Sequence, residues 1–478
     1  MKLTQSPIWV RFEIWIVALG SFLFYAFLLS QGDFLPDGDA YFHIKIADLI
    51  LHQGFVGSLP WMAESIHATK YVDYHFLFHL FLAPFALVFS DLALAARTAT
   101  AVAGAFSCAM FALLLKRREA KYRWFWVLAY LLVSPVFTGR LLFGRGATLF
   151  LGVLFLFIDS LESRKLKVAA LLMGAAVWLY PGFPVLLLFL FFRFVSGGLQ
   201  GDWQVRSTLL IIAAAIVAFI IHPSFPAQFY GYWLEFVVHA LHPPDLEAIG
   251  EWLAPDREIL FLACLPLALL IGRRLLYPAI RTPLAYASLV MALLFLFVLP
   301  ASLKPVEYLI PFAILFLALE EESQTPRRVL GSALLLFMLG FSLPQLVVRM
   351  KQQIEAANPA GEFEAADWLL ANTPHASLVL ISWGEFPKFF FRNSENRYPF
   401  GLNPVYSYGN NPNRYLLLRA FLEANAQNFY EVPRILGSQY VVLSPLAHER
   451  TIGLLLQMPE TATLVFRNQK FFIFKFKP

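Results

Sequence analysis

The chain has 478 residues, of which 59% are hydrophobic and only 14% charged, with a mean hydropathy of +0.63. These proportions indicate a polytopic membrane protein, and they exclude a soluble multidomain enzyme and a disordered or coiled-coil chain. The two cysteines, Cys108 and Cys264, both lie in apolar runs, so a disulfide framework is excluded. The basic residues behind the formal charge of +5 cluster between apolar runs, which is typical of membrane-flanking loops and not of a nucleic-acid surface.

A helix needs about 20 apolar residues to cross the hydrocarbon core of a bilayer. The first apolar window is predicted to be an uncleaved span and not a signal peptide, because it is long, carries Glu13 and shows no small-residue cleavage site. We predict about eleven spans in all. They lie near residues 8–30, 92–115, 123–139, 146–160, 166–180, 182–198, 207–222, 258–272, 282–300, 305–319 and 327–347.

Lys and Arg set the predicted orientation, because cytoplasmic loops carry an excess of both. One alternating set of connections holds nearly all the clusters. Its members are Lys116, Arg117, Arg118, Lys121, Arg123, Arg164, Lys165, Lys167, Arg273, Arg274, Arg281, Arg327 and Arg328. We predict that this set and the N-terminus are cytoplasmic, in a cytoplasmic (inner) membrane. The opposite set, which includes the acidic first loop 31–91 and the loop 223–257, is predicted to lie outside.

This assignment requires residues 72–90 to form an amphipathic helix at the outer interface and not a span. Asp73, His75 and His79 favour that choice, because ionisable groups in a lipid-facing span are costly. If the segment did span, the basic block at Lys116 would lie outside.

Residues 349–478 are more polar, and their apolar runs shorten to strand length. They are predicted to form a soluble α/β domain outside the membrane, after a transmembrane domain at 1–348. The expected elements are a helix at 362–372, a strand at 377–382, a helix near 413–426, a strand at 439–444, a helix near 446–457 and a closing hairpin around Asn468 and Gln469.

Two carboxylates follow the first predicted span. Asp37 and Asp39 flank a glycine, directly before a stretch with an amphipathic helical face. Carboxylates at the water interface can orient a cation or accept a proton from a nucleophilic hydroxyl or amide. The alternative is that Asp39 only caps the helix, with Ala40 as its first residue, and that Asp37 is solvated.

Three cations in segments predicted to lie outside are candidate phosphate ligands. Arg140 and Arg145 lie in an outside turn, against the orientation rule, and Lys304 is a similar lone cation near Glu307. A guanidinium binds phosphate oxygens in a bidentate manner. Snorkelling to lipid headgroups is the alternative for the arginines.

The remaining polar clusters are less specific. His75 and His79 are four residues apart, a spacing that permits metal binding, although no HExxH pattern is present and anchoring at headgroups is the alternative. The segment 223–257 is predicted to be either a mobile loop that covers a lipid-linked substrate or an interfacial aromatic belt. The sequence holds no Gly-rich phosphate loop and no serine nucleophile elbow, which argues against ATP-driven and serine-hydrolase chemistry.

The first acidic stretch resembles that of GT-C glycosyltransferases, most closely the catalytic subunits of oligosaccharyltransferases. Residues 303–319 resemble a late span of that family, and residues 365–390 resemble the start of its soluble domain. The resemblance covers most of the chain and implies a GT-C fold. The residues that match the first motif are Asp39, Tyr41, Phe42 and His43.

The sequence also departs from the oligosaccharyltransferase pattern. The place of the family's second acidic motif holds Arg140 and Arg145 and no carboxylate. Trp383 is followed by Gly384 and Glu385, where the family has a Trp-Trp-Asp motif that reads the acceptor. These departures argue against sequon-directed N-glycosylation and against a metal site completed by the second motif.

The resemblance implies an integral-membrane glycosyltransferase that takes a sugar or glycan from a polyprenyl phosphate or diphosphate carrier on the outer side of the cytoplasmic membrane. Asp39 is then the base or the ligand of a divalent cation, Mg or Mn, and Asp37 supports it. The resemblance then implies that Arg140, Arg145 and Lys304 bind the donor phosphate. The positions expected to support the site are His43, Asp73 and His75.

The expected partners are a polyprenyl-linked sugar donor, membrane lipids and an acceptor that is a glycan, a lipid or a protein, with no nucleic acid. Two alternatives stay open. An O-antigen ligase or polymerase-like enzyme also uses outside arginines, but it needs no acidic motif after the first span. A lipid-linked sugar transporter would show broken or charged helices at mid-membrane depth, and often a repeat between halves.

Overall fold

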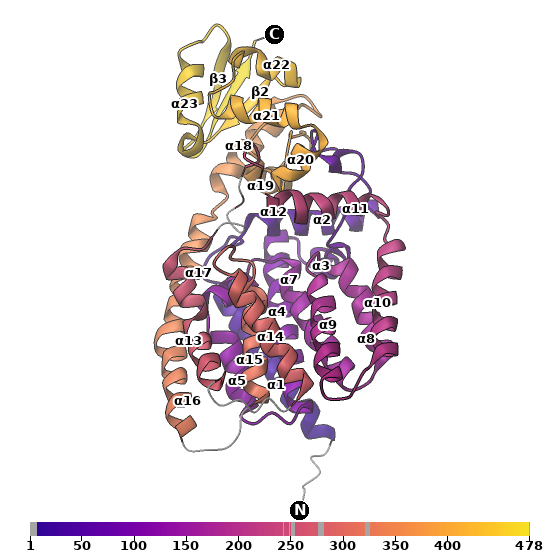
Figure 1. Ribbon diagram of the computed structural model, residues 1–478. Helices are drawn as coiled ribbons and strands as arrows, with labels where there is room; N and C mark the ends of the chain where they lie inside the picture. Colours follow the sequence, from indigo (N-terminus) through magenta and orange to yellow (C-terminus); the bar gives the residue numbers. More distant parts are fainter. Residues whose placement is uncertain are drawn as a thin grey trace, which may run out of the picture.

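The computed structural model describes residues 7–241, 243–247, 249, 254–275, 282–320 and 326–477. Parts of the segment 223–257 and the basic residue Arg281 lie outside the described residues, as do the side chains of Arg273, Arg274, Arg327 and Arg328. The protein is mostly helical. A bundle of long helices carries a smaller α/β domain at one end, and α1 begins at the opposite end (Figure 1).

The bundle is built from apolar helices, and each window predicted as a span falls on one or more of them. Its elements are α1 (Pro7–Leu29), α4 (Leu92–Arg117), α5 (Arg123–Leu132), α6 (Pro135–Leu141), α7 (Gly146–Glu162), α8 (Leu166–Leu179), α9 (Pro184–Gly198), α10 (Val205–Ile220), α13 (Arg257–Leu275), α14 (Pro283–Val298), α15 (Val306–Leu319), α16 (Pro326–Phe337), a π-helical turn (Met338–Ser342) and α17 (Leu343–Ala356).

Not every bundle helix is long enough to span by itself. In the described part of the chain, three helical stretches are long and apolar enough to cross a membrane: Phe12–Leu29, Leu92–Arg117 and Ser332–Asn372. A bent pair of helices adds a fourth if it counts as one span, and six more apolar helices have 10 to 17 residues. The number of eleven spans therefore stays a prediction.

The window 123–139 is not one straight helix. It breaks into α5 and α6, which meet at an angle of 79°. Ser134 adopts an extended conformation and its hydroxyl accepts a hydrogen bond from the backbone N–H of Phe137, while Pro135 occupies the first position of α6. A serine cap followed by proline starts a new helix, so the continuous helix expected from hydropathy is wrong at this point.

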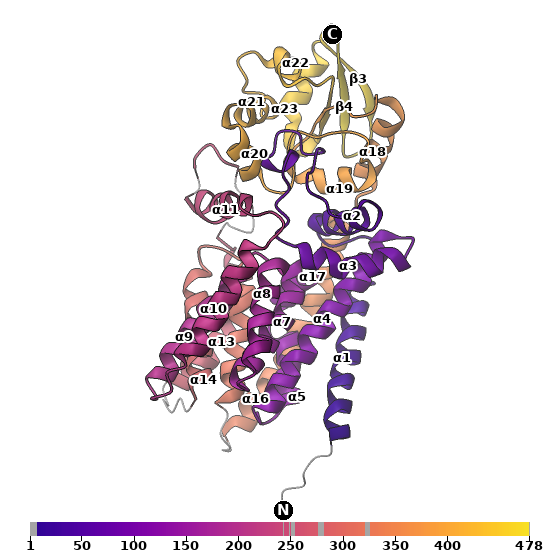
Figure 2. The ribbon, with the colours of Figure 1, turned by 90° about the vertical axis from the view of Figure 1, so that its right-hand side faces the viewer.

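Short helices lie across the end of the bundle, between it and the α/β domain (Figures 1 and 2). They are α2 (Gly38–Gln53), α3 (Phe76–Val88), α11 (Ala227–Tyr232), a π-helical turn (Trp233–Val238) and α12 (His239–Leu241), with a 3₁₀ turn at Ile66–Ala68. The predicted second interfacial helix is present but starts later than expected. Asp73 precedes α3 and His75 is its N-cap, so only His79 lies on the helix.

The C-terminal domain confirms the predicted order of elements. Its sheet has the strand order β1-β2-β4-β3, with β1 parallel to β2 and the other pairs antiparallel. Three short helices, α19, α20 and α22, were not expected. The elements are α18 (Ala360–Asn372), β1 (Val379–Leu380), a 3₁₀ turn (Trp383–Glu385), α19 (Phe386–Arg392), α20 (Pro404–Asn410), α21 (Pro412–Leu422), a 3₁₀ turn (Phe429–Glu431), α22 (Val432–Leu436), β2 (Tyr440–Leu443), α23 (Pro445–Leu456), β3 (Ala462–Arg467) and β4 (Phe472–Phe476).

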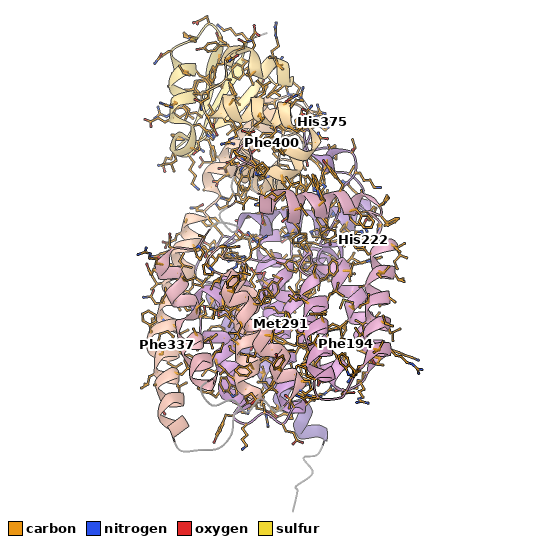
Figure 3. All side chains as sticks on the ribbon, in the orientation of Figure 1. Phe194, His222, Met291, Phe337, His375 and Phe400 are labelled. Atoms are coloured by element: carbon orange, nitrogen blue, oxygen red, sulfur yellow. The ribbon has the colours of Figure 1, made fainter. Side chains whose placement is uncertain are left out.

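The core of the bundle is closely packed, and side chains such as the fully buried Met291 of α14 fill the space between helices (Figure 3). Helices α1 and α4 approach each other closely at Gly104. A Cβ atom there would lie 2.5 Å from the ring of Tyr25, which has no exposed surface. The glycine therefore lets an aromatic ring of α1 rest on the backbone of α4.

We expect Gly104→Ala to destabilise the protein by about 2 kcal/mol, because the enclosed Tyr25 ring has no room to move away from the added methyl group. Thermal unfolding in detergent should show the loss as a lower midpoint. Gly20→Ala on α1 is the matched control, since nothing lies within 4 Å of its Cβ position. Equal midpoints for the two variants would contradict the packing argument.

Candidate active site

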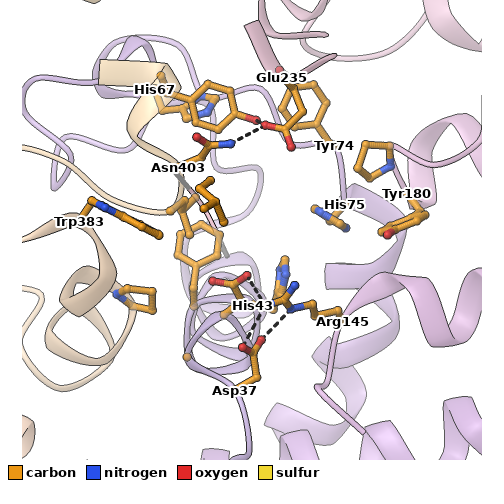
Figure 4. A pocket seen from close by; sticks show the side chains of 18 of the residues that line it. Asp37, His43, His67, Tyr74, His75, Arg145, Tyr180, Glu235, Trp383 and Asn403 are labelled. Carbon is orange, nitrogen blue, oxygen red and sulfur yellow. Dashed lines mark hydrogen bonds and ion pairs between the residues drawn. The ribbon is translucent and has the colours of Figure 1, made fainter. Parts of the chain in front are cut away.

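A cavity of about 400 Å³ lies where the bundle, the short helices and the C-terminal domain meet (Figure 4). One part of its lining comes from α2, α3 and the bundle and is rich in charge. These residues include Asp37, Asp39, His43, His75, Arg140, Arg145, Lys304 and Glu307. The opposite part is more aromatic. It includes His67, Tyr74, Glu235, Trp383, Asn403 and Tyr406.

Arg145 joins the two carboxylates at the start of α2. Its Nε and Nη2 atoms donate to the two carboxylate oxygens of Asp37 at 2.7 and 2.9 Å, and Nη2 lies 3.1 Å from Oδ2 of Asp39. Asp37 is the N-cap residue of α2, but its side chain makes no capping hydrogen bond. The alternative in which Asp39 caps the helix is therefore wrong. Both carboxylates instead face Arg145, the residue that precedes α7.

Arg140 is held by a different carboxylate. It is 7% exposed, and its Nε donates to Oε1 of Glu307 on α15 at 2.7 Å. In a poorly solvated place a paired guanidinium costs much less than an isolated one. Lys304 lies in the turn before α15, with its Nζ 4.0 Å from Glu235. The three predicted cations thus line one cavity, each beside a carboxylate.

The histidines form a buried hydrogen-bonded chain behind α2. Nδ1 of His43 lies 2.9 Å from Nε2 of His79, and Nδ1 of His79 lies 2.8 Å from Oδ2 of Asp73. Burial alone would raise the pKa of Asp73, but the neighbouring His79, which donates a hydrogen bond to the carboxylate, outweighs burial and holds that pKa below its usual value. Burial, reinforced by the neighbouring His75, His79 and Arg145, lowers the pKa of His43 well below its usual value.

His75 lies beside this chain and also lines the cavity. Its backbone N–H donates to the other carboxylate oxygen of Asp73 at 2.9 Å. Burial, reinforced by the neighbouring His79, lowers the pKa of the His75 imidazole to about 3. Both histidines at the cavity wall are therefore neutral near pH 7.

The aromatic side of the cavity is organised around Glu235, in the π-helical turn after α11. Its Oε2 accepts hydrogen bonds from Nδ2 of Asn403 at 2.8 Å and from the hydroxyl of Tyr406 at 3.0 Å. Trp383 of the C-terminal domain also lines this side. The described part of the segment 223–257 is largely helical, and through Glu235 it joins the C-terminal domain to the cavity.

The described residues of the cavity do not form a ligand set for the predicted divalent cation. Among the residues that the structure describes, no group of three or more His, Cys, Asp or Glu is arranged to hold a metal ion. Asp37 and Asp39 are already bridged by a guanidinium, which supplies positive charge at the place where the ion would sit. The donor set does not fit a Mg²⁺ or Mn²⁺ site, since such ions prefer several oxygen ligands and water.

All the predicted catalytic and phosphate-binding residues thus line one cavity, as do His43 and His75, and Asp73 stands behind its wall. Sequence reasoning missed His67, Tyr74, Asn403 and Tyr406. Asn403 followed by Pro404 is a helix-start signal that would have located α20. No pattern in the sequence indicates that these side chains meet Glu235, because that contact depends on how the C-terminal domain packs.

No family model matches the sequence, and no curated protein matches it. Several solved structures are similar to this chain. The oligosaccharyltransferase of Archaeoglobus fulgidus in its apo form is 13% identical and superposes with a TM-score of 0.61 over 89% of this chain and 69% of that chain. ArnT from Cupriavidus metallidurans bound to undecaprenyl phosphate is 14% identical, with a TM-score of 0.59 over 98% of both chains.

Both structures are GT-C glycosyltransferases. The chain has the GT-C fold. The predicted resemblance to oligosaccharyltransferase catalytic subunits is thereby confirmed at the level of fold. In this chain the carboxylates, arginines and histidines meet in the cavity between the bundle and the C-terminal domain.

We expect the protein to lose stability as the pH falls from about 6.5 toward 4. Burial lowers the pKa of His67, which is 1% exposed and packs on Tyr406, to about 4. Below its ordinary pKa of about 6.5 the unfolded chain takes up a proton that the folded chain does not, so this contribution is present above 6.5 and is lost on acidification. His67 alone contributes about 3 kcal/mol to this change.

Thermal unfolding measured from pH 7.5 to 4.5 tests this expectation. His67→Asn keeps an acceptor for the backbone N–H of Val72 but removes the titrating group. Its midpoint should fall less steeply with acidification than that of the wild type. Parallel curves would show that His67 does not carry this pH dependence.

Proposed function

We propose that the chain is an integral-membrane glycosyltransferase that moves a sugar or glycan from a polyprenyl phosphate or diphosphate carrier to an acceptor on the outer side of the cytoplasmic membrane. The observation that carries the proposal is the pair Asp37 and Asp39, bridged by Arg145, in a cavity that also holds Arg140 and Lys304. The GT-C fold supports it. The undecaprenyl phosphate bound to ArnT, a protein with this fold, also supports the proposal.

The charges suit transfer from a phosphate-linked donor. As the bond between the anomeric carbon and the phosphate oxygen breaks, negative charge builds on the leaving phosphate. Arg145 and Lys304 are 21% and 32% exposed in the cavity wall, so each can reach that phosphate. Asp39, whose side chain is 38% exposed, accepts a hydrogen bond from the acceptor hydroxyl or amide and orients it.

The remaining parts then have distinct roles. Asp37 holds Arg145 in place by its bidentate contact. Arg140 and Glu307 keep a neutral pair at the edge of the bundle, where an unpaired charge would be costly. The segment with Glu235 and the C-terminal domain cover the cavity from the side opposite the carboxylates, which keeps the reacting groups away from bulk water.

We expect Asp39→Asn to lower transfer at least about 100-fold, because the neutral amide is a much weaker hydrogen-bond acceptor than the carboxylate and loses the ion pair with Arg145 that orients it. The measurement is mass spectrometry of polyprenyl-linked sugars and of surface glycans in the native host, a deletion strain and complemented strains. A lipid-linked sugar should accumulate, and one glycan should vanish, in the deletion and Asp39→Asn strains. Asp33→Asn, on the same connection but exposed and away from the cavity, is the control that should restore the wild-type pattern.

The pattern of products separates the alternatives. Full activity of Asp39→Asn would overturn the proposal and favour a lipid-linked sugar transporter. Accumulation of a lipid-linked polymer or its repeat unit would instead indicate an O-antigen ligase or polymerase-like enzyme. The glycan that disappears identifies the acceptor.

We expect transfer in purified membranes to persist in excess EDTA, because Arg145 already supplies the positive charge between the two carboxylates. The assay follows release of the polyprenyl phosphate from the donor that accumulates in the deletion strain. Loss of activity in EDTA, with recovery on addition of Mg²⁺ or Mn²⁺, would restore the predicted cation at Asp39.

A further inference from the structure

With both histidines neutral, the hydrogen bond to Asp73 sets the direction of the buried histidine chain. An ionised carboxylate only accepts hydrogen bonds, so Nδ1 of His79 must carry the proton that it shares with Asp73. In a neutral imidazole the other nitrogen is then an acceptor, and Nε2 of His79 accepts from Nδ1–H of His43. His43 is left with its proton on Nδ1 and a lone pair on Nε2.

That lone pair is directed to the reaction site. His43 lines the cavity, and its Nε2 atom has no hydrogen-bond partner among the described residues. This nitrogen is also not among the fully buried polar atoms that lack a partner, so it is accessible from the cavity. His79 and Asp73, by contrast, are 0% and 2% exposed, behind the cavity wall. His43 is four residues after Asp39 on α2, so the two side chains share the same face of the helix.

The surroundings keep His43 in the form that accepts a proton. The titratable and charged groups near it are Asp39 one turn earlier on α2, His75 at the N-cap of α3, His79 on α3, and Arg145 before α7. Its pKa lies well below the ordinary value, chiefly through burial, so it is neutral at physiological pH. When a proton arrives on Nε2, the positive charge that forms faces the His79–Asp73 pair, whose carboxylate offsets it.

We propose that His43 is a catalytic base of the transfer reaction, taking the proton of the acceptor hydroxyl on Nε2, with His79 and Asp73 as positioning residues. This inference rests on the proposed function. The acceptor oxygen forms its bond to the anomeric carbon, the bond from that carbon to the phosphate oxygen breaks, and the carrier phosphate leaves with the electron pair. The proton stays on Nε2 of His43 until water or the released phosphate takes it.

In this proposal Asp39 and His43, one turn apart on α2, have different roles in the reaction. The carboxylate of Asp39 shares Arg145 with Asp37, and the contact at 3.1 Å holds that carboxylate in a fixed direction. Asp39 therefore orients the acceptor, while His43, one helical turn further on, receives the proton. The Asp73–His79 chain resembles the orienting part of a hydrolytic triad in its logic, since each member fixes the tautomer of the next.

The first test is His43→Asn, assayed in membranes with the polyprenyl-linked sugar extracted from the deletion strain. The Asn amide keeps a donor near the position of Nδ1 for His79, and it removes the base. We expect kcat to fall at least about 100-fold with little change in the KM for the donor. His52→Asn makes the same exchange on the exposed side of α2 and should keep wild-type turnover.

Chemical rescue separates a base from a structural residue. In His43→Ala, added imidazole should restore part of the activity in proportion to its unprotonated concentration. Activity of His43→Asn within about threefold of the wild type would overturn the proposal, as would a loss in His43→Ala that imidazole does not relieve. If Asp39→Asn is inactive in the same assay, such a result removes the role of His43 and leaves the proposed function standing.

A second test needs no substrate. Diethyl pyrocarbonate acylates an accessible, unprotonated imidazole nitrogen, and peptide mass spectrometry locates the adduct. In the full-length protein we expect labelling of His43 and of the exposed His52, and none of His79, whose two nitrogens are both engaged. Protection of His43 with labelling of His79 would show that the hydrogen-bond directions are wrong and would overturn the proposal.

Discussion

The contact of Arg145 with two carboxylates is the constraint on which the rest of the site depends. Asp37 and Arg145 are 108 residues apart in the chain, yet they meet through two hydrogen bonds between the start of α2 and the start of α7. Neither charge is fully solvated, so each requires the other. The ion pair therefore fixes where α2 lies across the end of the bundle, and with it the positions of Asp39 and His43.

Much of this arrangement could be predicted from the sequence, because hydropathy locates apolar helices independently of their packing. All eleven windows fall on helices, and the alternating runs near Asn468 form the expected hairpin of β3 and β4. The break between α5 and α6 was missed because hydropathy does not register a cap, although Ser134 followed by Pro135 carries the signal. The expected helix over 72–90 includes Asp73 and His75 for a related reason, since hydropathy does not register the N-cap at His75.

The partners of the site residues could not be predicted in the same way. The sequence marks Arg140 as a cation out of place, but its pairing with Glu307 joins residues 167 positions apart and depends on the packing of α6 against α15. The link from His43 to His79 likewise appears only once α2 and α3 lie side by side. Residue types and depth in the membrane indicate what chemistry is available. Tertiary packing decides which groups neutralise each other and which remain to act.

The π-helical turn at Met338–Ser342 has a geometric effect on the helix that follows it. Such a turn is equivalent to one extra residue in an α-helix, and it rotates everything after it by about 100° and shifts it by about 1.5 Å along the axis. Leu346, Met350 and Ile354 of α17, spaced at four-residue intervals, all face the bundle core with this phase. In an ordinary α-helix of the same sequence that stripe would be rotated by about 100° away from the bundle core. The wider turn thus sets the rotational phase with which the chain leaves the bundle and enters the domain that covers the cavity.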